Sequence, residues 1–197
     1  MTQLVLVRHA TCTQMDEILL GRRVDAALDR HGVRQARALA EALADRVPAP
    51  LVYSSPRRRA RQTAAAIAAR CGIRTRVRSE LDEVDFGGWA GRSFTELEHD
   101  PAWRKWNTQR AGAHTPTGET IASVQARVLS LLEALVRQAP CTSIVLVTHA
   151  EVIRSIVIHC MQLTPDHYDR ITIDPASITM LRVHGSCIER LNERPLP

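Results

Sequence analysis

The chain has 197 residues, a formal net charge of +5 and a charged fraction of 24%, which indicates one soluble globular domain with a core of its own. No stretch approaches the ~20 apolar residues of a membrane span, and the first residues lack the pattern of a signal peptide, so we expect no membrane contact and a cytoplasmic location. The five cysteines are scattered and form no C-x-x-C pair, which argues against a disulfide framework and against a zinc site.

The first half of the chain predicts alternating strands and helices. Residues 4–7 are a short run of apolar side chains, typical of a parallel strand that is buried on both faces. Apolar residues at spacings of three and four predict a helix over 32–47. A second strand is predicted over 51–54 and a helix over 56–70, with a proline in its first turn. A short strand follows through residue 77.

The second half begins with a loop-rich segment, residues 80–118, which we call the cap segment and expect to cover the site. A helix over 121–135, a strand over 144–147 and a helix over 151–163 come next. The stretches SITMLRV and CIERL predict a hairpin at the sheet edge, where two copies of the chain can pair as a homodimer. The whole chain, residues 1–197, therefore predicts one α/β domain: a three-layer sandwich whose mainly parallel central sheet has helices on both faces and an antiparallel edge strand.

Two of the predicted strands end alike. The first reads QLVLVRHA and the later one SIVLVTHA, so His9 and His149 follow the two strands at matching positions. In open α/β sheets, ligands bind at the carboxyl ends of the strands, so we expect both imidazoles in one site together with Arg8. Imidazoles and guanidiniums without carboxylate or cysteine partners suit a phosphate dianion better than a metal ion.

A histidine in such a site is a competent nucleophile toward phosphorus while its attacking nitrogen is unprotonated, and neighbouring cations favour that neutral form. Cleavage of a phosphomonoester also needs a proton donor for the leaving oxygen. Asp82, Glu83 and Asp85 in the stretch LDEVDFGGW are three candidates, among which the residues alone do not choose. Cys12 lies near His9 in the sequence, but we expect it to be a core or loop residue rather than a nucleophile.

The basic run RRRAR, residues 57–61, has three interpretations. It is a solvated helix face, a surface for nucleic acid, or part of a site for a phosphorylated small molecule. Aromatic residues make up only 4% of the chain, too few for the stacking platforms of single-stranded nucleic-acid binding, so we expect no nucleic-acid partner. A nucleic-acid-binding module stays a remote alternative.

The motifs together resemble the histidine phosphatase superfamily, the phosphoglycerate-mutase-like proteins, and within it the short bacterial phosphatases. The resemblance extends over almost the whole chain in the right order. It is carried by Arg8-His9-Ala10-Thr11, by Ser54-Ser55-Pro56 with Arg59-Ala60-Arg61-Gln62-Thr63-Ala64, by Leu81 to Gly91, by Pro116-x-Gly118-Glu119-Thr120 and by Val147-Thr148-His149-Ala150.

This resemblance implies a role for each matching residue. His9 would be the nucleophile that becomes phosphohistidine, and Glu83 the acid that protonates the leaving group and then activates water. Arg8, Arg59 and His149 would hold the phosphoryl group. The phosphate or substrate contacts would be completed by Ala150, Gly21, Arg22 and Gln14. No metal and no other cofactor is implied.

The chain departs from the family pattern at several positions. Met15 stands where the family usually has an asparagine that helps to bind phosphate, and Gln14 is the candidate substitute. The stretch Gly21-Arg22-Arg23 aligns in two ways, so either arginine can face the substrate. Alanine follows each histidine, where glycine is commoner.

The predicted reaction is hydrolysis of a small phosphorylated metabolite, and the alternative is a phosphoglycerate mutase, an isomerase. A mutase must exclude water from its intermediate, and the family's true mutases are longer chains with extra segments over the site. This chain is short, and its length and its W-x-x-W stretch resemble the branch that includes α-ribazole phosphatases.

Overall fold

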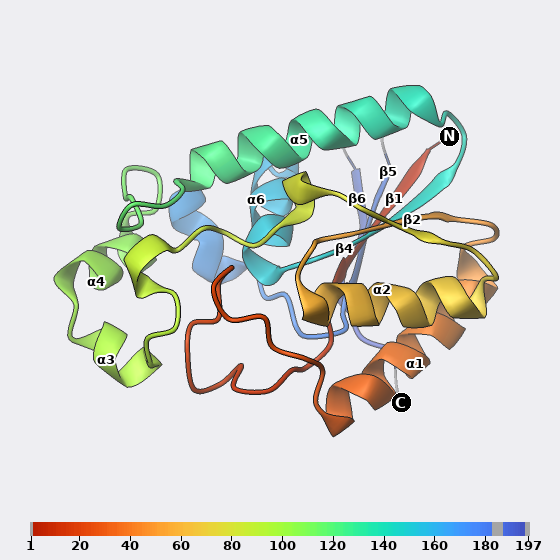
Figure 1. Cartoon of the computed structure of the whole chain (residues 1–197). Helices are drawn as coiled ribbons and strands as arrows, with labels where there is room; N and C mark the ends of the chain where they lie inside the picture. Colours follow the sequence, from red (N-terminus) through yellow and green to blue (C-terminus); the bar gives the residue numbers. More distant parts are fainter. Residues whose placement is uncertain (1, 183–186, 196–197) are drawn as a thin grey trace.

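The computed structural model describes residues 2–182 and 187–195, and within them one six-stranded sheet in the order β3-β2-β4-β1-β5-β6 (Figure 1). The strand bounds are β1 Gln3–Arg8, β2 Leu51–Ser54, β3 Thr75–Val77, β4 Ser143–Thr148, β5 Ile178–Arg182 and β6 Cys187–Glu193. The pairs β3/β2, β2/β4 and β4/β1 are parallel, whereas β5 is antiparallel to both β1 and β6. The predicted hairpin is present as β5 and β6, and its turn lies outside the described residues.

Helices cover both faces of this sheet, which confirms the predicted three-layer α/β architecture (Figure 1). The helices α1 (Arg30–Arg46) and α2 (Arg58–Arg70) pack on one face, and α5 (Ile121–Gln138) and α6 (Ala150–Cys160) pack on the other. The side chains of β1 pack alternately against the two helix layers, because successive residues of a strand point to opposite faces of the sheet. The odd positions Val5 and Val7 belong to the α1/α2 core, and the even positions Leu4 and Leu6 to the α5/α6 core.

The helix ends differ from the predicted bounds by a few residues. Helix α1 begins two residues earlier than predicted, because Asp29 is its N-cap and accepts a hydrogen bond from the Gly32 amide. Helix α6 ends at Cys160, three residues early, and Gln162 just beyond it has a positive φ of 55°. Along the described part of the chain, no helix is both long and apolar enough to cross a membrane.

The cap segment is more ordered than predicted. It contains two short helices, α3 (Phe94–Glu98) and α4 (Pro101–Thr108), which the loop-rich prediction missed. Both had readable start signals: Ser93 and Glu96 form a capping box at α3, and Asp100 caps α4 ahead of a proline. The indole ring of Trp103 in α4 packs edge to face against that of Trp89, which precedes α3, with the ring centroids 5.3 Å apart.

Candidate active site

The register of β1 and β4 brings the two histidines together. Arg8 pairs with Thr148 across the two parallel strands, so His9 and His149 leave neighbouring strands at the same edge of the sheet. The amide of His9 donates to the Thr148 carbonyl at 3.0 Å. The ring centroids of the two histidines lie 5.1 Å apart, and both residues are buried. The equivalent strand endings of the sequence thus deliver two imidazoles to one place, at the carboxyl ends of the strands.

The hydrogen bonds of His9 determine its tautomer. Its Nδ1 lies 2.8 Å from the carbonyl oxygen of Ala10, which only accepts, so Nδ1 carries the proton. Its Nε2 accepts from Nε of Arg59 at 3.2 Å, so Nε2 keeps its lone pair. Burial, followed by the charges of Arg59 and Arg8, holds the pKa of His9 well below its usual value. The result is a neutral imidazole whose Nε2 is available as a nucleophile.

Arg59 links the two histidines. It is the second residue of α2, its side chain is buried, and its Nη2 donates to the Gly21 carbonyl at 2.9 Å and to Nδ1 of His149 at 3.3 Å. Arg8 anchors one of its nitrogens on the Ile173 carbonyl at 2.6 Å. Both guanidiniums line a cavity of about 290 Å³, where they present donors that match phosphate oxygens.

Most of the predicted site residues line this cavity. They share its inner end, where the strand ends and the first turns of α2 and α6 meet: Arg8, His9, Gly21, Arg59, Glu83 and Ala150. His149 lies just behind them, in contact with Arg59 and Glu83. Met15, the residue in place of the family asparagine, also lines the cavity, and its sulfur is a weak acceptor 3.7 Å from Nη2 of Arg8.

Three residues with a predicted substrate contact lie elsewhere. Gln14 sits in a turn with a φ of 62° and does not line the cavity, and neither do Arg22 and Arg23. Arg22 instead donates from Nε to the carbonyl of Glu83 at 2.6 Å and from Nη2 to the carboxylate of Glu119 at 2.7 Å. Its guanidinium supports the loop that carries Glu83, and this contact could not be read from an ambiguous alignment.

Glu83 is the one of the three candidate carboxyls that lines the cavity. Its Oε1 accepts from the Val84 amide at 2.9 Å, and its Oε2 is 3.6 Å from Nδ1 of His149. Burial raises the pKa of Glu83 to about 7, against the opposing charge of Arg59. Asp85 accepts from the Gly87 amide at 3.0 Å, and Asp82 faces Arg57. Glu83 can therefore be protonated near neutral pH and donate that proton.

The outer wall of the cavity contains a polar cluster that the sequence did not suggest. Glu151, two residues after His149, forms ion pairs with Arg110 and Arg154. Burial alone would raise the pKa of Glu151, but these two guanidiniums leave it lowered. The guanidinium of Arg110 stacks on the Tyr168 ring, 3.5 Å from its centroid. The only sequence signal for this cluster is that Glu151 directly follows the second-histidine motif.

Glu119 is a second residue that the motif implied without a role. Its carboxylate accepts from Arg22, from Nε of Arg127 at 2.9 Å and from the Asp85 amide at 3.0 Å. Both arginines also donate to the carbonyl of Glu83. Glu119 therefore anchors the loop that carries the candidate acid.

We expect Glu119→Gln to lower the free energy of unfolding by about 1–3 kcal/mol, because its amide group turns a donor toward the donors that the carboxylate accepted. Activity should fall as well, since the Glu83 loop loses its anchor. Urea unfolding monitored by circular dichroism measures the change. The matched control is Glu133→Gln on α5, an exposed carboxylate that pairs with Arg137; an equal loss in both variants would contradict the anchoring role.

Burial describes two further features of the sequence, Cys12 and the basic run 57–61. Cys12 packs with Leu20 and Ala26, and burial raises the pKa of its thiol to about 11, so it is a core residue and not a nucleophile. The basic run does not form one exposed face, because Arg57 pairs with Asp82 and Arg59 enters the site. Two of its four arginines are therefore directed inward, whereas Arg58 and Arg61 are exposed.

Known proteins resemble this chain over most of its length. A family model described as the histidine phosphatase superfamily (branch 1) matches residues 4–193. Phosphoserine phosphatase 1 of Hydrogenobacter thermophilus is 29% identical over 168 residues, which cover 84% of this chain and 78% of that protein. A histidine-to-alanine variant of the phosphoserine phosphatase from Entamoeba histolytica, solved in complex with phosphoserine, aligns with a TM-score of 0.86 and 28% identity over 98% of both chains. A mycobacterial glucosyl-3-phosphoglycerate phosphatase aligns with a TM-score of 0.85 and 28% identity, covering 96% of this chain and 98% of that one.

Proposed function

We propose that this chain, which belongs to branch 1 of the histidine phosphatase superfamily, hydrolyses the phosphomonoester of a small metabolite through a phosphohistidine on His9. The observation that carries the proposal is the hydrogen bonding of His9. Nδ1 holds its proton against the Ala10 carbonyl, and the lone pair of Nε2 lies beside the guanidinium of Arg59. A nucleophile and a phosphate-binding cation are thus already in contact.

The reaction has two steps. In the first, Nε2 of His9 forms a bond to phosphorus while the bond to the leaving oxygen breaks, and Glu83 donates its proton to that oxygen. In the second, the Glu83 carboxylate takes a proton from water, whose oxygen attacks phosphorus and releases His9 as inorganic phosphate forms. Arg8, Arg59 and His149 stabilise the charge on the equatorial oxygens in both steps.

The substrate class follows from the cavity and from the relatives. A space of about 290 Å³ lined by Arg8, Arg59, Arg110 and Arg154 suits a small anionic ester. Relatives of similar length are named for phosphoserine and for glucosyl-3-phosphoglycerate as substrates. We propose that the cap segment closes the outer side of the cavity, because its residues Phe86, Phe94 and Trp103 line the cavity wall.

Purified protein incubated with p-nitrophenyl phosphate in EDTA should release p-nitrophenol, because no step above uses a metal ion. A panel of phosphorylated metabolites that includes phosphoserine and phosphoglycerates then ranks the substrates. A 3-phosphoglycerate mutase assay run alongside distinguishes hydrolysis from the alternative mutase reaction. Phosphoryl transfer between hydroxyls that outpaces release of inorganic phosphate would replace hydrolysis by the mutase reaction.

The pH dependence follows from the two titrating groups. Glu83 must be protonated to act as the acid, so kcat/KM should fall as the pH rises through about 7. The pKa of His9 is held well below 6.5, so the nucleophile stays unprotonated on the acid side and causes no loss there. Values of kcat/KM measured on both sides of pH 7, corrected for ionisation of the substrate phosphate, test this pH profile. The alkaline decrease should disappear in Glu83→Gln; its persistence would assign it to another group.

A further inference from the structure

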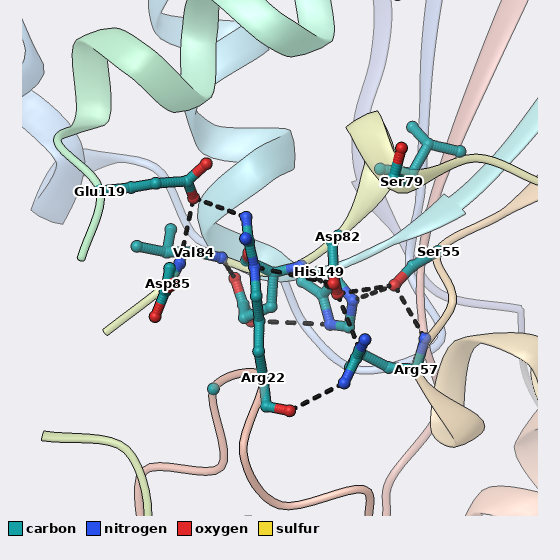
Figure 2. Close-up of polar contacts among 12 residues, drawn as sticks. Arg22, Ser55, Arg57, Ser79, Asp82, Val84, Asp85, Glu119 and His149 are labelled. Atoms are coloured by element: carbon teal, nitrogen blue, oxygen red, sulfur yellow. Dashed lines mark hydrogen bonds and ion pairs between the residues drawn. The ribbon is translucent and has the colours of Figure 1, made fainter. Parts of the chain in front are cut away.

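A chain of hydrogen bonds extends from His149 through Ser55 to the carboxylate of Asp82 (Figure 2). Nε2 of His149 lies 2.8 Å from Oγ of Ser55, and the same oxygen lies 3.3 Å from Oδ1 of Asp82. The backbone amide of Arg57 also donates to Oγ of Ser55, at 3.2 Å. All three side chains in the chain are buried.

The direction of these hydrogen bonds follows from counting donors and acceptors. A serine hydroxyl has one proton and two lone pairs, a carboxylate only accepts, and a backbone amide only donates. The Ser55 proton therefore goes to Asp82, and one lone pair takes the Arg57 amide. The other lone pair remains for His149, so Nε2 of His149 carries a proton.

The opposite side of the His149 ring gives an independent check. Its Nδ1 lies 3.3 Å from Nη2 of Arg59, a nitrogen that only donates, so Nδ1 is unprotonated in the free enzyme. The same Nδ1 is 3.6 Å from Oε2 of Glu83. Nδ1 is thus the nitrogen that faces the reacting groups, and Nε2 is the one held from behind.

Asp82 is itself well supported. Its Oδ1 lies 3.0 Å from Nε of Arg57 and its Oδ2 3.6 Å from Nε of Arg22. Its Oδ1 also accepts from the Glu83 amide at 2.9 Å. The Asp82 carboxylate is therefore joined to the main chain of the candidate acid. Through Ser55 it is also joined to the second histidine (Figure 2).

We propose that Asp82 is a positioning residue that acts on His149 through Ser55. It keeps the Nε2 proton on His149, directs Nδ1 toward the phosphoryl group, and stabilises the imidazolium that forms when Nδ1 takes up a proton from the phosphoryl group of the bound substrate. The catalytic consequence rests on the proposed function, whereas the tautomer of His149 does not.

The charges around His149 show why such a group is useful. Burial and then Arg59 of α2, His9 and Arg8 at the end of β1, and Arg127 of α5 all lower the pKa of His149. Glu83 is the carboxyl on the cavity side of His149. In the proposed reaction it gives its proton to the leaving oxygen, so its own charge changes during the reaction. The fixed negative charge of Asp82 behind the His149 ring offsets part of the repulsion between these cations and a protonated His149. In that arrangement His149 can donate to phosphate from Nδ1.

The test uses Ser55→Ala and Asp82→Asn. Ser55→Ala removes the link without changing charge. Asp82→Asn places an amide there, which donates as well as accepts, so the Ser55 hydroxyl can turn its proton toward Nε2. The matched control is Asp85→Asn, the same change three residues along the loop at a carboxylate whose side chain accepts from Gly87. Thermal unfolding of each variant verifies the fold, and Ser55→Ala decides alone if Asp82→Asn does not fold.

The readout is the ¹⁵N spectrum of protein labelled at histidine, with the His149 signals assigned by their loss in His149→Gln. Wild type and Asp85→Asn should show a protonated Nε2 and an unprotonated Nδ1. Ser55→Ala and Asp82→Asn should shift His149 toward the other tautomer and lower kcat at least about tenfold. The double variant should lose no more than the worse single one, since both act through one chain.

An unchanged His149 tautomer in both single variants would overturn the proposal, and so would fully additive losses of kcat. If the tautomer shifts as expected but wild type hydrolyses no phosphomonoester, the proposed function fails while the positioning of His149 by Asp82 stands.

Discussion

His9→Ala loses phosphatase activity by at least about 10³-fold in kcat, the scale expected when the nucleophile of a covalent mechanism is removed. The residual rate comes from phosphate binding by Arg8 and Arg59, which alanine leaves in place. The substitution leaves the strand pairing intact, since the His9 amide still donates to the Thr148 carbonyl. Steady-state assays with p-nitrophenyl phosphate measure the loss, and circular dichroism verifies the fold.

The matched control is His159→Ala, an exposed imidazole in the last turn of α6. It removes the same side chain at a distance from the cavity and should retain full activity. If His9→Ala retained the wild-type rate, the imidazole of His9 would not be the nucleophile.

Glu83→Gln should produce the second large effect, and its size should depend on the leaving group. An alkoxide such as the one from phosphoserine leaves poorly without a proton, so we expect a loss of about 10²–10³-fold in kcat/KM for alkyl phosphates. Nitrophenolate leaves without protonation, so its ester should lose about tenfold or less in the same step. The difference is measured with a series of aryl and alkyl phosphates of increasing leaving-group pKa. In the variant, kcat/KM should fall more steeply with leaving-group pKa than it does in wild type.

Asp85→Asn is the control for this experiment, because Asp85 belongs to the same loop but does not line the cavity. Its dependence on the leaving group should match that of wild type. Equal losses of Glu83→Gln on alkyl and aryl esters would remove Glu83 as the acid and leave it a structural part of the cavity wall.

The fold was largely predictable because its buried strands and amphipathic helices have simple patterns. The apolar runs at 4–7 and 144–147 identify strands buried on both faces, and α5 follows from its periodic stripe. Helices α3 and α4 were missed, since five and eight residues are too few to establish a helical period. Their capping residues were the available signal.

The inner end of the site was predictable for a topological reason. A histidine that ends a buried strand must lie at the carboxyl edge of the sheet, and two such strands that pair in register place His9 beside His149. The choice of Glu83 among three carboxyls came from the family resemblance. Its burial in the cavity wall and its raised pKa are tertiary properties that no local pattern contains.

The supporting groups were not predictable for a related reason. Arg22 and Arg57 belong to stretches that suggest substrate contact or solvent, yet both face Asp82. Whether an arginine side chain turns inward depends on the carboxylate that a distant loop places beside it. Asp82 and Glu119 are those carboxylates, and only the packed structure reveals their partners.

The central claim, a covalent phosphohistidine on His9, is tested most directly by rapid chemical quench with a ³²P-labelled phosphomonoester. We expect an acid-labile, alkali-stable label on the peptide that contains His9, formed before inorganic phosphate is released and absent from His9→Ala. Turnover by wild type without any trapped label under conditions that slow the second step, or a label that persists in His9→Ala, would contradict it.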